Sequence, residues 1–109
     1  MYATSLNTAY ILTTSLPNEY FLVENRQALG YDRGLQGPLG AGFGGLAIWH
    51  IDENTITNKI DFNTVNNSEC YPGGPSCAVD HYGVALMQAD GSWHLEKNSN
   101  RGNASDLWY

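Results

Sequence analysis

The chain has 109 residues, 42 % of them hydrophobic, and a formal net charge of −6 at neutral pH. This length predicts one domain with its own core. The five basic residues are scattered, so the sequence lacks the positive patch that nucleic acid or an anionic membrane surface requires. No apolar run approaches the roughly 20 residues of a spanning helix, and we expect no membrane insertion.

The first 20 residues lack the basic start and the long apolar stretch of a signal peptide. The last residues, ASDLWY, carry no polar tail. From these two features we expect residues 1–109 to form a single β-rich module that belongs to a larger protein.

Four segments have the alternating or continuous apolar pattern of strands. They are residues 8–14 (TAYILTT), 19–26 (EYFLVENR), 45–52 (GLAIWHID) and 83–90 (GVALMQAD). The short link SLPN (15–18) predicts a hairpin between the first two. No window of 11 or more residues carries a helical stripe. The pattern predicts a mostly β fold, a small antiparallel sheet or sandwich of about four main strands with long Gly/Asn-rich loops.

The connections between these strands are unusually long. Residues 28–45 are rich in glycine, which predicts a loop with little regular structure. Residues 54–62 (NTITNKIDF) are interpreted as an irregular turn or a short strand. Long loops in a compact domain indicate either function or missing neighbours.

Two strands end in polar side chains that share a face. Glu24 and Arg26 are expected to form a structural polar cluster that ties the Gly-rich loop and neighbouring strand ends in place. His50 and Asp52 are a candidate metal pair, which Asp80 and His81 would join if the third and fourth strands pair. The alternative is a histidine ring fixed by a carboxylate at the strand end.

Cys70 and Cys77 bracket the Pro/Gly-rich loop CYPGGPSC. This spacing favours a local disulfide over free thiols or metal ligands, because the further ligands of a finger-like zinc site are missing. A disulfide in turn favours an extracellular setting.

The sequence offers no catalytic motif. The three histidines, His50, His81 and His94, do not form HExxH, and no serine lies in a G-x-S-x-G elbow. We therefore assign no catalytic residue.

The C-terminal loops are rich in oxygen donors that calcium prefers. Asp90, Asn103 and Asp106 are candidate calcium ligands, with Asn98 and Asn100 nearby. The spacing is not that of an EF-hand, and the alternative is that these side chains form Asx turns with their own backbone.

Five motifs now stand in one order along the chain: EYFLVENRQ, GYDRGL, GGLAIWHIDE, HYGVALMQADG and NRGNASDLW. This order resembles the segment that follows the catalytic core in secreted zinc metalloproteases of the immune-inhibitor-A-like family. The resemblance runs from about residue 9 to the C-terminus. The loop from Cys70 to Cys77 has no counterpart in that pattern and is interpreted as an insertion particular to this sequence.

The resemblance implies a non-catalytic accessory region, secreted or extracellular, whose partner is the catalytic domain of a parent chain. The zinc and the HExxH centre of the family lie upstream of this segment, so zinc is expected only in that absent domain. The family's tail is usually of the form G-D-A-G-D, whereas residues 102–106 here are GNASD. Asn103 replaces one aspartate of that form and Ser105 replaces one glycine. These replacements weaken the calcium assignment implied by the resemblance.

Two other functions remain open. An extracellular binding module would use aromatic faces for stacking, and the candidates are Tyr31, Trp49, Trp93 and Trp108. A self-assembling, fibre-like structural subunit would pair through exposed strand edges.

Overall fold

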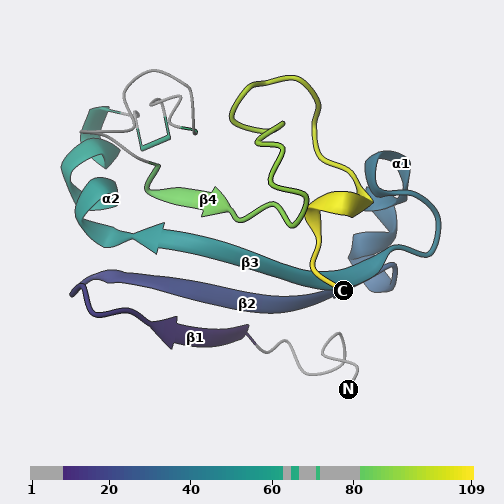
Figure 1. Ribbon diagram of the computed structural model, residues 1–109, viewed down its shortest axis with the longest axis horizontal. Coiled ribbons are helices and arrows are strands. Elements are labelled where there is room, and N and C mark those ends of the chain that lie inside the picture. The colour runs from purple at the N-terminus through teal and green to yellow at the C-terminus, as the bar shows by residue number, and fades with distance from the viewer. Residues whose placement is uncertain (1–8, 63–64, 67–70, 72–81) are drawn as a thin grey trace.

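The computed structural model describes residues 9–62, 65–66, 71 and 82–109 (Figure 1). Its centre is one four-stranded antiparallel sheet in the order β1-β2-β3-β4. The strands are β1 (Ala9–Thr13), β2 (Glu19–Gln27), β3 (Gly44–Asp52) and β4 (Val84–Leu86). The predicted mostly β fold with about four antiparallel strands is confirmed, and so is the hairpin between the first two strands.

The fourth strand is shorter than the sequence pattern predicts. Residues 83–90 were expected to be extended, but β4 ends at Leu86. Past this point Gln88 is buried and its side-chain amide donates to Glu96. Met87 still donates its backbone N–H to the carbonyl of Ile48 in β3, and the chain leaves β3 where Gln88 makes this contact.

The interpretation of residues 54–62 as a turn or short strand is wrong. They form most of helix α2 (Glu53–Lys59) and the following 3₁₀ turn η3 (Ile60–Phe62). The cause is the side chain of Asp52, which accepts the backbone N–H groups of Asn54 and Thr55 and so caps the helix.

The Gly-rich connection is also more regular than predicted. It contains the 3₁₀ helix η2 (Gly30–Leu35) and the single turn α1 (Gln36–Leu39). Gly40 ends α1 with a φ of 90°, a conformation in which a side chain would be strained. Among the described helices, none is long and apolar enough to cross a membrane.

One face of the sheet carries the core. Paired residues point to the same side of a sheet and successive residues alternate, so Ala47 and Ile51 of β3 share this face, and both are buried. Phe43 and Leu107 pack with Ala47 in the main cluster. A Cβ on Gly45 would lie 2.9 Å from both the Leu107 Cβ and the Trp108 carbonyl oxygen. Glycine there lets the C-terminal segment lie against the sheet.

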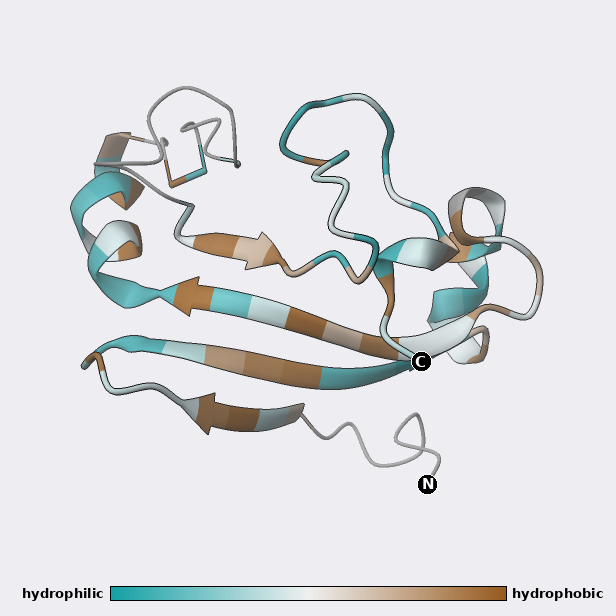
Figure 2. Cartoon of the chain, viewed as in Figure 1, coloured by the Kyte–Doolittle hydropathy of each residue, from teal (hydrophilic) through white to brown (hydrophobic). Residues whose placement is uncertain are grey.

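The opposite face is not buried and is mostly apolar, with Asn25 and His50 among its residues. We call its six apolar residues the apolar sheet face: Tyr10, Leu12, Phe21, Val23, Leu46 and Ile48. All six are exposed or only half-buried. Figure 2 shows the apolar residues running across β1, β2 and β3. A solvated face of an antiparallel sheet normally carries polar residues, so this face has the composition of a covered surface.

The small core predicts a clear difference between buried and exposed leucines. Leu107 is 5 % exposed and Leu29 is 48 % exposed. We expect Leu107→Ala to lower the free energy of unfolding by about 2–5 kcal/mol, and Leu29→Ala by no more than about 0.5 kcal/mol. Urea denaturation followed by tryptophan fluorescence measures both. Equal losses would contradict the assignment of Leu107 to the core.

Candidate functional site

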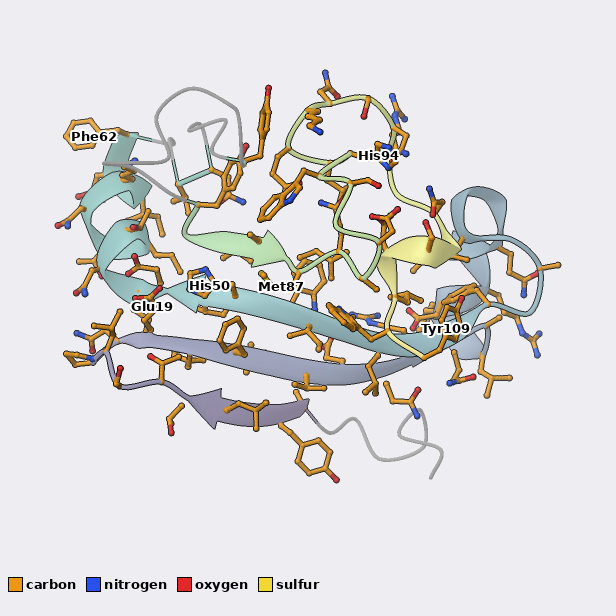
Figure 3. All side chains as sticks on the ribbon, in the orientation of Figure 1. Glu19, His50, Phe62, Met87, His94 and Tyr109 are labelled. Atoms are coloured by element: carbon orange, nitrogen blue, oxygen red, sulfur yellow. The ribbon has the colours of Figure 1, made fainter. Side chains whose placement is uncertain are left out.

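Three chemically active side chains converge where the loop after β4 meets the C-terminal 3₁₀ turn η4 (Ala104–Asp106). We call Asp90, His94 and Asp106 the C-terminal cluster. Each offers one ligand-type atom, and these atoms all lie within 4.8 Å of one another. The Nδ1 atom of His94 lies 3.9 Å from Oδ2 of Asp90. Figure 3 shows His94 on the loop that follows β4.

Asp106 is the most buried member, with only 1 % of its surface exposed. Its Oδ2 atom accepts the backbone N–H of Asn103 at 2.7 Å. Its Oδ1 atom is buried and has no hydrogen-bond partner. A buried carboxylate that keeps one oxygen unsatisfied is costly unless a positive charge compensates it.

His94 is positioned by its backbone and carries a second unsatisfied atom. Its N–H donates to the side-chain oxygen of Gln88 at 2.8 Å, and its carbonyl accepts the N–H of Ser99 at 2.9 Å. Its Nδ1 atom is buried without a hydrogen-bond partner. The fixed backbone therefore directs an unpaired ring nitrogen toward the two carboxylates.

Asp90 completes the cluster as an ionised group. Its Oδ1 accepts the backbone N–H of Ser92 at 2.9 Å, and its Oδ2 accepts the hydroxyl of Ser105 at 2.9 Å. The hydrogen bond from Ser92, then that from Ser105, hold the pKa of Asp90 below its ordinary value against a small opposing effect of burial. The carboxylate form, which is the form that binds cations, is therefore favoured at neutral pH.

The three candidate calcium ligands do not contribute equally. Asp90 and Asp106 lie together, but the side chain of Asn103 caps η4 by accepting the N–H of Ser105 at 2.8 Å. Asn100 likewise accepts the N–H of Gly102 at 2.8 Å. These are the Asx contacts that the sequence offered as the alternative. Calcium at this place stays a prediction.

His94 is the residue that sequence reasoning missed. His94 follows Asp90 by four residues. That spacing brings two side chains together in a helix, but it does not indicate a shared site in a loop. The signal lies in the Asp-Gly pair at 90–91, which predicts a turn, because a turn brings residues on either side of it close together.

The candidate metal pair at His50 and Asp52 has other contacts. The His50 Nε2 atom lies 2.6 Å from Oε1 of Glu19, and its ring centroid is 5.3 Å from that of Phe21; Figure 3 shows Glu19 beside His50. Asp52 accepts two backbone N–H groups of α2 and the hydroxyl of Thr55. Asp80 and His81 lie outside the described residues.

The polar end of β2 has the contacts expected of a structural cluster. Arg26 pairs with Glu24 and with Asp32 of η2, each at 2.9 Å, and Glu24 also accepts the indole N–H of Trp49 at 3.1 Å. Burial alone would lower the pKa of Arg26, but the hydrogen bonds to Asp32 and Glu24 outweigh it and raise this pKa. The cluster joins β2, β3 and the Gly-rich connection.

Two sequence predictions cannot be placed in space. Cys70 and Cys77 lie outside the described residues, so the disulfide stays a prediction. Comparison with protein-family models, with curated proteins and with solved structures finds no match for this chain.

The capping role of Asp52 makes a direct prediction. Asp52→Ala removes the acceptor for two N–H groups and is expected to lower the free energy of unfolding by about 1 kcal/mol, within 0.5–2. Asp52→Asn keeps a capping oxygen, so most of the stability should remain. Thermal unfolding followed by circular dichroism compares the two. An asparagine variant as unstable as the alanine variant would show that charge, and not capping, is the contribution of Asp52.

Proposed function

We propose that this chain is a non-catalytic, β-rich accessory module of a secreted zinc metalloprotease-like protein. Its apolar sheet face packs against the catalytic domain of the parent chain. The observation that carries the proposal is the uncovered apolar sheet face itself. The order of motifs that resembles the immune-inhibitor-A-like family supplies the identity of the partner.

The apolar sheet face has the character of an interface. Tyr10 and Leu12 of β1 are 53 % and 55 % exposed, and Leu46 of β3 is 41 % exposed. These residues join half-buried neighbours in adjacent cross-strand pairs, with Tyr10 opposite Val23 and Val23 opposite Ile48. Contiguous apolar surface of this kind marks contact sites in soluble proteins, and burying it stabilises a complex by roughly 25 cal/mol per Å² before the costs of association.

The charge pattern supports an apolar partner surface. No lysine or arginine of the four strands lies on this side of the sheet, and His50, which pairs with Phe21 and contacts Glu19, lies beside the six residues at one end of the strands. The sequence contains no HExxH motif, so the proposal assigns zinc and peptide hydrolysis to the parent's catalytic domain. The secreted location belongs to the same proposal.

A second function is favoured by the edge strand. β1 is one of the two outer strands of the sheet, and all five of its residues are exposed. It contains no lysine or proline, the residues that usually protect an edge from pairing. Self-assembly of a structural subunit would use this edge, and copies would then pair strand to strand.

Activity of the chain alone separates an accessory module from an enzyme. The purified chain is expected to leave casein intact, with or without added zinc. Casein cleavage that is abolished by EDTA would overturn the proposal.

Matched lysine variants on one strand separate docking from self-assembly. The double variant Tyr10→Lys/Leu12→Lys places charge on the apolar sheet face, whereas Ile11→Lys places charge on the same strand but on the opposite face, at a site that is 62 % exposed. In the parent chain we expect the double variant to lower the Tm by several degrees, since each lost kcal/mol shifts Tm by about 2–4 °C. Ile11→Lys should leave it within a degree or so.

Light scattering of the chain alone completes this test. If the accessory proposal holds, the chain alone is a monomer, or it is a weak dimer that the double variant converts to a monomer. A large assembly that both lysine variants dissociate to the same extent would contradict the accessory proposal and would support self-assembly through the β1 edge.

A further inference from the structure

We infer that the C-terminal cluster is a binding site for a divalent transition-metal ion of the zinc type, held by Asp90, His94 and Asp106. This site is separate from the zinc centre that the proposed function places in another domain. It does not depend on that function, because no residue of the apolar sheet face takes part.

The unsatisfied atoms carry the argument. Asp106 is almost completely buried, its Oδ1 has no hydrogen-bond partner, and Nδ1 of His94 is buried without one as well. Both residues belong to the group that offers one ligand-type atom each, all within 4.8 Å of one another, and Nδ1 of His94 lies 3.9 Å from Oδ2 of Asp90. No lysine or arginine of the described part of the chain forms an ion pair with Asp106. A bound cation would satisfy the oxygen and the ring nitrogen together.

The spacing suits one small ion. Two ligand atoms bound to zinc at about 2.0–2.2 Å in tetrahedral geometry lie roughly 3.3–3.6 Å apart. The His94 and Asp90 ligand atoms lie 3.9 Å apart. The widest separation in the cluster is within 4.8 Å, so the side chains must approach one another by up to about 1.5 Å to hold the ion.

The donor set selects the class of ion. An imidazole nitrogen suits zinc and its neighbours in the transition series, whereas calcium and magnesium take oxygen ligands. Calcium also needs six to eight oxygens, and the side-chain amide of Asn103 is engaged in capping η4. The carboxylate form of Asp90 is the form that metal binding requires.

The ion would add a link between two segments that hydrogen bonds already join. Asp90 and His94 belong to the loop after β4, and Asp106 belongs to η4 next to the buried Leu107. The backbone bond from the N–H of Ala89 to the carbonyl of Asp106 and the Ser105–Asp90 bond already hold them in register. A metal bound only by the native arrangement stabilises the fold by mass action.

The test is calorimetric titration of the whole chain, freed of metal with EDTA and treated with iodoacetamide so that no thiol competes. Zinc chloride is expected to bind with one ion per chain and to raise the Tm. Calcium chloride at the same concentrations should give neither effect. Cobalt chloride should give the visible absorption of a low-coordinate site.

The variants locate the ion. Asp106→Asn and His94→Gln are each expected to weaken zinc binding by at least about tenfold and to remove the rise in Tm. The matched control, Asp61→Asn at an exposed position of η3, should bind zinc as the unchanged chain does.

Stability without metal keeps the test decisive if one variant folds poorly. Because an asparagine side chain keeps an oxygen for the N–H of Asn103 and brings no charge into the buried position, Asp106→Asn should be about as stable as the unchanged chain when metal is absent. Zinc binding that survives both Asp106→Asn and His94→Gln would overturn the inference, and so would no zinc binding or binding of calcium alone.

Discussion

The ladder between β2 and β3 positions every other described element of the molecule. All nine residues of β2 pair with β3, from Glu19 opposite Asp52 to Gln27 opposite Gly44. β1 and β4 add to the outer sides of this pair. The register fixes which side chains share a face, because a slip of one residue would exchange the two faces completely. The core, the apolar sheet face and the polar cluster of Arg26 all follow from it.

The ends of this ladder explain how polar chemistry comes to lie beside a small core. At one end Asp52 leaves β3 and immediately caps α2. At the other end Leu46 exchanges backbone hydrogen bonds with Trp108, so the C-terminal segment continues the sheet where β4 stops. This pairing fixes the backbone at Trp108, two residues after Asp106. The C-terminal cluster is therefore held by the sheet, although all three of its side chains come from loops and a single 3₁₀ turn.

Much of the sheet follows from sequence pattern, because strands alternate with a period of two and the hairpin turn is short. The helix after Asp52 was missed, since seven residues are too few for a helical stripe to emerge; the acceptor at its start and Lys59 in its last turn were the available signals. β4 ends just before the Gln88–Glu96 contact, which no local pattern encodes. The turn at residues 90–91 brings His94 near Asp90, but only tertiary structure brings Asp106 to them. The ion pair of Glu24 with Arg26 was within reach because both lie on one strand, two residues apart.

The central claim is that the apolar sheet face is covered in the working protein, and hydroxyl-radical footprinting with mass spectrometry tests it most directly. Tyr10 lies on that face and is 53 % exposed in this chain, whereas Tyr31 of η2 is fully exposed and serves as an internal reference. We predict that the oxidation rate of Tyr10, relative to Tyr31, is high in the chain alone and falls severalfold in the proposed parent protein. An unchanged ratio would show that the face stays open to solvent and would contradict the account.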